Sequence, residues 1–329
     1  MIITQTPYRI SLFGGGTDYP AWYRHNEGMV VGFAINRYCH VGLKYTPPGQ
    51  GVKYRIVYSK IEDRESVETI EHPAVRGVLR HMPPPHPVEI HHMGDLPAMG
   101  GLGASSSFVV GLLYAMRILL KKGWCSDSDL ALQAIDVERN VIGEAVGDQD
   151  QMFAALGGFR VIRFNSGGAR IEQIKIDPGF LCDLEDSLVL AHTGKARYAH
   201  EIAAKVIGSI PGNQETLHSM VEVANEGRAA LLSQDLAALG QCLNRSWRLK
   251  SRLHAEISSP DIEALYTCGL RLGALGGKLL GAGGGGFMLF IVPPEIRNRF
   301  IKEIGVPCVT KLRVSKHGAR ILWNQQSEV

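Results

Sequence analysis

One segment constrains this chain more than any other, because in it a glycine-rich loop runs directly into three serines (residues 97–107, PAMGGLGASSS). An apolar run at 108–120 follows and predicts a helix. Glycines at positions 100, 101 and 103 let the backbone approach an anion closely, and the N–H groups and positive dipole end of the helix favour phosphate there. The serine hydroxyls remain available as Mg²⁺ ligands. The segment therefore predicts a nucleotide phosphate site.

The phosphate loop common to many nucleotide-binding proteins does not occur in this sequence. Neither GxxxxGKS nor GxxxxGKT is present, and no lysine follows the last glycine of the segment. We therefore expect a different kinase architecture.

Length and composition predict an enzyme of about two domains that acts on a small molecule. The chain has 329 residues, 45% hydrophobic and 20% charged, and apolar runs such as 287–292 fall short of the ~18 residues that span a membrane. No signal-peptide pattern is visible, so we expect a cytoplasmic protein without a membrane partner. A net charge of +3 without a basic block argues against nucleic acid. Six separated cysteines without a CxxC pair predict reduced thiols, and assembly into a homodimer stays open.

The order of the predicted elements indicates an α+β fold in two units, 1–180 and 181–329. In the first unit we expect strands at 8–13, 29–35, 41–45, 53–58 and 88–92, helices at 108–122 and 129–145, and a hairpin over 158–176. Asp177-Pro178-Gly179 marks the boundary. In the second unit we expect a strand at 188–191, helices at 213–232, 236–254 and 261–272, and a glycine loop that leads into a strand within 278–292.

Glu138 carries the first candidate functional carboxylate. Its neighbours at helical spacing of three, four and seven residues are all apolar, so the side chain projects from a buried face. A buried carboxylate needs a cation, and that cation is either an arginine such as Arg139 or a bound Mg²⁺. The serine loop favours Mg²⁺.

Two further acids lie in the segment GDQDQ (147–151), which follows the helix predicted at 129–145. Phosphoryl transfer to an alcohol uses a carboxylate that accepts the hydroxyl proton, and either Asp148 or Asp150 can supply it. Capping and turn formation by aspartate explain the pattern equally well.

The N-terminal segment TPYRISLFGGGTDY (6–19) places Arg9 and Asp18 at opposite ends of one strand and its turn. Asp18 would accept hydrogen bonds from sugar hydroxyls, and Arg9 would stabilise phosphate charge or hold the base ionised. The cluster GAGGGG (281–286) satisfies GxGxxG, but it precedes a strand instead of opening a helix, so we reject a dinucleotide fingerprint.

Together, TPYRISLFGGGTDY, LPAMGGLGASSS and KLLGAGGGGF resemble, in that order, the three motifs of the GHMP kinases, the superfamily of galactokinase, homoserine kinase and mevalonate kinase. The resemblance covers nearly the whole chain. It implies ATP and Mg²⁺, an N-terminal ATP-binding domain like ribosomal S5 domain 2 and a ferredoxin-like C-terminal domain.

The resemblance also implies roles for individual residues. Asp150 becomes the base, with Arg9 as its partner, and Glu138 with Ser105 or Ser106 becomes the metal site. The nucleotide site comprises Gly100, Gly101, Leu102, Gly103, Ala104, Ser105, Ser106 and Ser107, and the substrate site comprises Gly15, Gly16, Thr17, Asp18, Thr193, Lys195, Arg197, Gly283 and Gly284. Gly15 and Gly16 replace a Glu and a His of the galactokinase pattern, so galactose is not the expected substrate.

The full string, including HTGKAR (192–197), is most similar to the D-glycero-D-manno-heptose 7-phosphate kinases and the related L-fucose kinases. This resemblance implies ATP-dependent phosphorylation of an anomeric hydroxyl, giving a heptose 1,7-bisphosphate for nucleotide-activated heptose and surface polysaccharide. The alternatives are an L-fucose or other hexose 1-kinase, a non-catalytic ATP and sugar sensor, and the diphosphomevalonate decarboxylase branch.

A sugar that already carries phosphate needs a second anion site. Basic side chains on a glycine turn after a strand are well placed to reach a phosphate, so we expect Lys195 and Arg197 to bind it. A basic helical stretch adds Arg245, Arg248, Lys250 and Arg252, and for Arg245 and Arg248 a solvated helix face is the favoured interpretation.

Overall fold

Two β-sheets organise the part of the chain that the structure, a computed structural model, describes: residues 1–47, 49, 54–97, 100–123, 125–195 and 199–325. The first sheet runs in spatial order through β12 (Arg320–Asn324), β1 (Ile2–Phe13), β2 (Gly28–Tyr45), β5 (Val88–Gly94), β3 (Tyr54–Val57) and β4 (Ile61–Arg64), and β6 (Phe159–Asn165) and β7 (Gly168–Gln173) extend it from β2. The second sheet runs through β11 (Cys308–Val309), β8 (Leu188–His192), β10 (Phe287–Ile291) and β9 (Gly276–Leu279).

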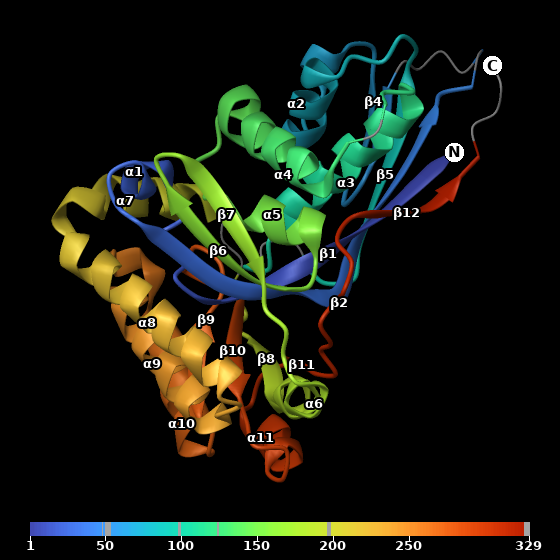
Figure 1. The fold of residues 1–329 in the computed structure, drawn as a ribbon. Helices are drawn as coiled ribbons and strands as arrows, with labels where there is room; N and C mark the ends of the chain where they lie inside the picture. Colours follow the sequence, from blue (N-terminus) through green and yellow to red (C-terminus); the bar gives the residue numbers. More distant parts are fainter. Residues whose placement is uncertain (48, 50–53, 98–99, 124, 196–198, 326–329) are drawn as a thin grey trace.

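Helices cover both faces of the first sheet. In chain order, the α-helices of the described residues and the one π-helix are α1 (Pro20–Tyr23), α2 (Pro73–His81), α3 (Ala104–Leu119), α4 (Asp127–Asp136), the π-helix (Val137–Ile142), α5 (Gln149–Leu156), α6 (Pro178–Ser187), α7 (Ala199–Ser209), α8 (Gln214–Leu232), α9 (Leu236–Arg252), α10 (Pro260–Arg271) and α11 (Arg297–Glu303). Figure 1 shows α2 to α5 on one side of β1 and β2, and α8 to α10 with the second sheet on the other side. The mixed content of helix and sheet confirms the predicted α+β class. Within the described residues, no helix has both the length and the apolar character needed to cross a membrane.

The long strands β1 and β2 form the centre of the molecule. Nearly every residue of β1 is buried, because α3 and α5 pack on one face of the strand while α8 and α9 pack on the other. β2 pairs with β6 through its first half and with β5 through its second half. A strand buried on both faces holds the segments at its end in fixed positions, and the candidate site lies there.

Close backbone approach sets the position of α5 on this sheet. A Cβ atom on Gly32 of β2 would lie 2.5 Å from the carbonyl oxygen of Ile10 and 3.0 Å from the ring of Phe153, a residue of α5. Only glycine therefore lets α5 sit at this depth. The same helix carries Asp150 in its first turn.

The structure differs from the sequence predictions in three elements. The strands expected at 29–35 and 41–45 are one continuous strand, β2, because β1 pairs with it along most of its length. The helix expected at 129–145 changes to a π-helix at Val137 and ends at Gly143, whose φ is +82°. The helix after the serine loop begins at Ala104, so all three serines lie in its first turn.

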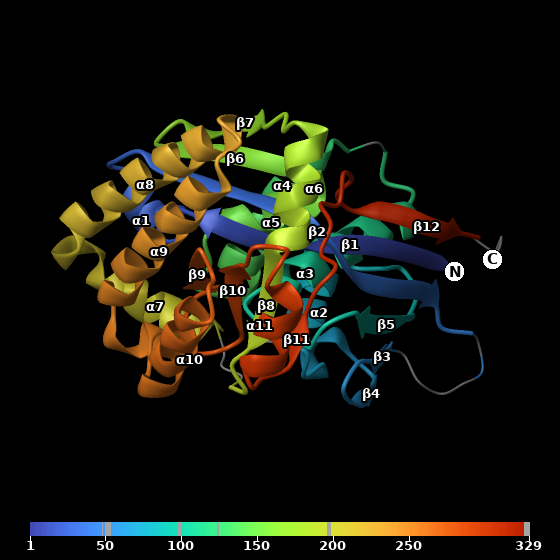
Figure 2. The same cartoon turned by 90° about the horizontal axis from the view of Figure 1, so that it is seen from below.

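The last strand returns to the first sheet. β12 pairs antiparallel with the start of β1, as Figure 2 also shows from a second direction. A division into 1–180 and 181–329, which stays a prediction, does not anticipate this return. All six cysteines have free thiols in the structure.

We predict that Gly32→Ala destabilises the protein, because the added methyl group forces α5 away from the sheet. Overpacking of this kind costs about 1–3 kcal/mol, measurable as a lower urea midpoint at an unchanged slope. Gly208→Ala in α7 is the matched control, since a Cβ atom there meets no atom within 4 Å and alanine favours the helix. Equal stability of the two variants would contradict this packing account.

Candidate active site

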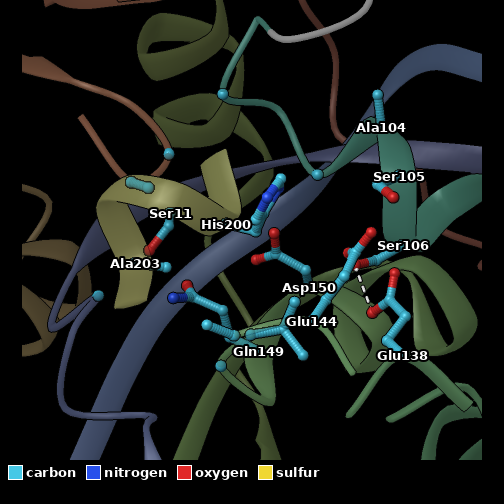
Figure 3. Close-up of a pocket in the computed structure, with 18 of the residues that line it drawn as sticks. Ser11, Ala104, Ser105, Ser106, Glu138, Glu144, Gln149, Asp150, His200 and Ala203 are labelled. Atoms are coloured by element: carbon cyan, nitrogen blue, oxygen red, sulfur yellow. Dashed lines mark hydrogen bonds between the residues drawn. The ribbon is translucent and has the colours of Figure 1, made fainter. Parts of the chain in front are cut away.

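A cavity of about 430 Å³ lies where the end of β1, the serine loop and the second sheet meet. Its wall includes residues from distant parts of the chain, among them Arg9, Asp18, Ser106, Glu138, Asp150 and Lys250. Figure 3 shows Asp150 near the centre of this pocket, with the Ser106–Glu138 pair on one side and Ser11 and Gln149 on the other. The fold therefore brings together the N-terminal segment, the serine loop, Glu138 and the GDQDQ segment, which the sequence analysis considered separately.

The glycine loop reaches the cavity because two of its residues have a left-handed backbone. Gly101 and Gly103 have φ values of +75° and +74°, and Gly103 is the N-cap of α3. A Cβ atom on Gly101 would lie 2.6 Å from the carbonyl oxygen of Leu280, at the start of the other glycine loop. The two glycine loops are thus in direct backbone contact. With Gly100 and Ala104, they line the cavity at the start of α3, where an anion is favoured.

The three serines have three different environments. Ser105 is exposed toward the cavity, whereas Ser106 is buried and its hydroxyl donates to Oε2 of Glu138 at 3.0 Å. Ser107 is turned away, and its hydroxyl donates to the carbonyl oxygen of Pro7 at 2.8 Å. Leu102 also packs into the core, and its carbonyl oxygen accepts from the N–H of Arg9 at 3.0 Å. Leu102 and Ser107 are absent from the cavity wall, and their predicted nucleotide contacts stay predictions.

Glu138 is fully buried on the π-helix, at the position that the helical spacing predicts. Its Oε2 accepts from Ser106 and from Nε2 of Gln151, while Oε1 has no hydrogen-bond partner among the described residues. Burial raises the pKa of this carboxyl to about 8; the hydrogen bond from Gln151 opposes the shift, and the charge of Glu144 contributes to it. An unpaired buried carboxylate oxygen beside a hydroxyl fits a hard divalent cation. Arg139, the alternative partner for Glu138, pairs with Asp148.

The described residues hold no cluster of three or more His, Cys, Asp or Glu side chains suited to a metal. Mg²⁺ commonly uses one or two protein oxygens and completes its shell with water and substrate phosphates. The pair Ser106 and Glu138 therefore fits a metal that enters together with a nucleotide.

Arg9 and Asp150 form a bidentate ion pair in which Arg9 is buried and Asp150 is partly exposed. Nε of Arg9 donates to Oδ1 of Asp150 at 2.7 Å, and Nη2 donates to Oδ2 at 2.6 Å. The remaining nitrogen, Nη1, donates to the carbonyl oxygen of Gly101 at 2.6 Å. This geometry fixes the plane of the carboxylate and faces it into the cavity.

Asp148, the alternative candidate for the base, is held elsewhere. Its carboxylate accepts from the hydroxyl of Tyr23 at 2.7 Å and from Arg139. It is absent from the cavity wall, where Asp150 is present. The geometry thus favours Asp150, in agreement with the motif resemblance.

Asp18 lies buried on the turn after β1 and faces the cavity. Its Oδ1 accepts from the N–H of Gly16 at 2.9 Å, and its Oδ2 accepts from the N–H of Gln149 at 3.4 Å. Burial raises the pKa of Asp18 to about 6, although the backbone hydrogen bond from Gly16 opposes the shift. Gly15 and Gly16 line the cavity as expected for the substrate turn. Thr17 is absent from that wall, because its hydroxyl bonds the carbonyl oxygens of Gly14 and Met29 within the turn.

Two residues predicted for the second anion site, Thr193 and Lys195, lie away from the cavity wall. The ammonium of Lys195 pairs with Asp261 at 2.5 Å, and the hydroxyl of Thr193 donates to the carbonyl oxygen of Gly286 at 2.9 Å. Neither residue lines the cavity, and Arg197 lies outside the described residues. Gly283 and Gly284 likewise pack against Ile257, so Gly281 and Ala282 form the cavity wall in their place.

Two buried lysines lie in the cavity wall; Lys278 was not predicted, and Lys250 was named only within a basic helical stretch. Lys250 on α9 is 6% exposed and Lys278 on β9 is 2% exposed. The signal for Lys250 was present in the sequence, because Leu243, Ser246 and Trp247 share its helix face, and all three are buried. Arg245 on the same helix is exposed and pairs with Glu226, as the prediction of a solvated face requires.

A group of rings also lines the cavity. The rings of His92 and Phe108 are tilted against each other with centroids 4.5 Å apart, and the ring of His72 contacts Phe108 in the same way at 5.1 Å. Burial lowers the pKa of His92 to about 4, so its imidazole is neutral near pH 7. Strand alternation does place His91 on the other face, where it pairs with Glu89.

Known proteins resemble this chain in sequence and fold. Residues 68–158 match the GHMP kinase N-terminal domain and residues 228–305 match the GHMP kinase C-terminal domain. The D-glycero-alpha-D-manno-heptose 7-phosphate kinase of Campylobacter jejuni is 30% identical over 92% of this chain and 93% of its own length. The galactokinase of a Roseiflexus species is 25% identical over 88% of this chain and 83% of its own length. The crystal structure of a D-glycero-D-manno-heptose 1-phosphate kinase from Bacteroides thetaiotaomicron superposes with a TM-score of 0.80 and 23% identity, covering 99% of this chain and 100% of that one.

A carboxylate oriented by a cation, a serine–carboxylate pair and a glycine loop at a helix start are the groups that phosphoryl transfer from a nucleotide requires. The fold and the site thus define a kinase of small molecules. The chain belongs to the GHMP kinase family, and within it the chain is a sugar kinase that uses ATP as its phosphate donor.

We predict that Ser106→Ala and Ser107→Ala separate function from stability. Ser107→Ala leaves the buried carbonyl of Pro7 without its donor, which costs about 1–3 kcal/mol of unfolding free energy, while the KM for ATP stays within twofold. Ser106→Ala removes an expected metal ligand, so the Mg²⁺ concentration for half-maximal activity rises about tenfold or more. Urea unfolding and ADP release measure the two effects. A large rise in the KM for ATP with Ser107→Ala at unchanged stability would return that serine to the nucleotide site.

Proposed function

We propose that the protein transfers the γ-phosphoryl group of ATP to the anomeric (C1) hydroxyl of D-glycero-D-manno-heptose 7-phosphate, giving the 1,7-bisphosphate. The observation that carries the chemistry is the bidentate Arg9–Asp150 pair at the wall shared with the serine loop. The choice of sugar is supported by the C. jejuni relative, whose name specifies heptose 7-phosphate and which aligns over 92% of this chain.

Asp150 accepts the proton of the C1 hydroxyl as that oxygen bonds to the γ-phosphorus and the bond to the β–γ bridging oxygen breaks, leaving ADP. Each oxygen of Asp150 keeps an electron pair for this proton, because Arg9 uses only one direction on each. An anomeric hydroxyl is more acidic than an ordinary alcohol, so one positioned carboxylate is a sufficient base.

The other residues of the cavity position the two substrates. Asp18 and the small turn at Gly15 and Gly16 offer acceptors and space to the sugar, and the start of α3 offers N–H groups to the phosphates. Ser106 and Glu138 would hold Mg²⁺, which neutralises charge on the transferred phosphoryl group when it is bound. His72, His92 and Phe108 form an aromatic part of the same wall, where a nucleobase can stack.

ADP release across a panel of sugars tests the substrate. The panel contains heptose 7-phosphate, heptose 1-phosphate, unphosphorylated heptose, mannose, L-fucose and galactose, because the names of the two heptose kinase relatives differ in the position of the phosphate. We expect saturable turnover with heptose 7-phosphate and a product whose ³¹P spectrum shows phosphates at C1 and C7. Turnover only with L-fucose or another free hexose would replace this proposal with the hexose 1-kinase alternative. ATP and sugar binding without turnover of any sugar would leave a sensor.

We predict that Asp150→Asn lowers kcat by ~10²–10⁴ while nucleotide affinity changes little, because the amide keeps the shape of the side chain and cannot accept the proton. Steady-state ADP release measures kcat, and calorimetry with a non-hydrolysable ATP analogue measures affinity. Asp148→Asn is the matched control, since its carboxylate pairs with Tyr23 and Arg139 away from the cavity wall. Turnover of Asp150→Asn within a few-fold of the wild type would remove this residue from the mechanism.

A further inference from the structure

Lys250 is a buried cation whose charge no described carboxylate neutralises directly. Its ammonium donates to two backbone carbonyl oxygens, those of Leu279 at 3.2 Å and of Gly281, and it takes part in none of the ion pairs of the described residues. An ammonium has three N–H donors, so one donor remains beyond these two bonds. Burying a charge without an opposite charge is costly, and a ligand can supply the missing partner.

Among the charged groups that act on Lys250 and Lys278, the positive charges outnumber the negative ones. Arg9 and Asp150 compensate each other through their bidentate pair. Lys278 on β9 adds a second buried ammonium, which donates to the carbonyl oxygens of Ser11 at 3.0 Å and Leu12 at 2.8 Å. Asp18 is then the remaining carboxylate that acts on both lysines, and its own pKa is raised toward the neutral form. When both lysines are protonated, this one acid does not balance their two ammonium groups.

Backbone contacts place Lys250 close to the reacting groups. Gly281, which accepts from Lys250, packs so tightly on the serine loop that a Cβ atom there would lie 2.5 Å from the Cα atom of Gly101. The carbonyl oxygen of Gly101 in turn accepts from Arg9. Lys250 and Arg9 thus hold the two glycine loops from either side of their contact, and both side chains line the same cavity.

We propose that Lys250, with Lys278 beside it, forms an anion subsite in the wall built by α9 and β9 and binds a terminal phosphate group of a substrate. The subsite rests on the proposed kinase function and replaces the one predicted around Lys195. Two phosphates share the required chemistry: the γ-phosphoryl group of the nucleotide and the phosphate that the sugar already carries.

Binding of a phosphate at this subsite is expected to change the protonation of Lys250. Burial lowers the pKa of Lys250 to about 7, with Arg9 lowering it further and Asp18 and Asp150 opposing the shift. Burial also holds the pKa of Lys278 well below its ordinary value. At pH 8 Lys250 is therefore largely neutral without ligand. A phosphate beside it favours the ammonium, so the protein takes up a proton from solution when the phosphate binds.

Calorimetry on four ligands identifies the phosphate. The nucleotide arm compares a non-hydrolysable ATP analogue with ADP, and the sugar arm compares heptose 7-phosphate with heptose. For Lys250→Gln, which keeps a donor for the carbonyl of Gly281 but loses the charge, we expect ~10–100-fold weaker binding of one phosphate-bearing ligand and less than twofold change for its counterpart. The arm that shows this difference names the source. Arg245→Gln on the same helix is the control, because it removes an exposed cation paired with Glu226.

Proton uptake provides the second measurement. Binding enthalpies at pH 8 in two buffers of different ionisation enthalpy give the number of protons bound, which we expect to be above zero for the wild type. Lys250→Arg keeps the positive charge at every accessible pH, so its proton uptake falls toward zero while phosphate binding is retained. This variant also keeps the test decisive if Lys250→Gln does not fold.

Equal loss of affinity for both members of each pair, or unchanged proton uptake in Lys250→Arg, would overturn the subsite and leave Lys250 as a structural tie. Failure of the wild type to bind heptose 7-phosphate would contradict the proposed substrate instead. The nucleotide arm would still decide the role of Lys250, because it does not depend on the sugar.

Discussion

The hydrogen bonds of Arg9 hold the site together. This one side chain starts on β1, reaches the carbonyl of Gly101 in the serine loop and pairs with Asp150 on α5. The guanidinium is planar and always charged, so it fixes the relative orientation of its partners as well as their distance. Because the Arg9 guanidinium is almost fully buried, removing Asp150 leaves a positive charge without compensation inside the protein. Because β1 is fixed between two helical layers, Arg9 also fixes the positions of Gly101 and Asp150.

The other ionisable groups of the cavity have pKa values that burial shifts and that bound ligands would shift back. Glu138 and Asp18 are acids whose pKa values burial raises, and Lys250 is a base whose pKa burial lowers. Burial therefore shifts the protonation equilibrium of each of these groups toward its neutral form. A metal ion and phosphates carry the charges that favour the ionised forms. The free energy of burying these groups is thus partly recovered only when the substrates bind.

Much of this arrangement could be predicted from the sequence, because the glycine loops and their neighbouring polar residues are local patterns. The α+β class, the burial of Glu138 and the grouping of Arg9, Asp18 and Asp150 with the serine loop all follow from short segments. The contacts at Thr17, Leu102 and Ser107 could not be resolved, because neighbouring residues on a tight turn or helix start face different directions. The positions of Lys195 away from the cavity and of Lys250 in its wall could not be predicted for a related reason. Which basic side chain faces the cavity depends on how α9 packs on β9, and that packing joins residues about thirty positions apart.

The pairing of β12 with β1 has a consequence for biosynthesis. β1 is translated before β12, so one of its two edges lacks this partner until residues 320–324 have been made. The second sheet and the helices that pack on it are encoded before that point. During translation the second sheet can therefore reach its final pairing while β1 still has an open edge, and the first sheet is completed only when β12 emerges.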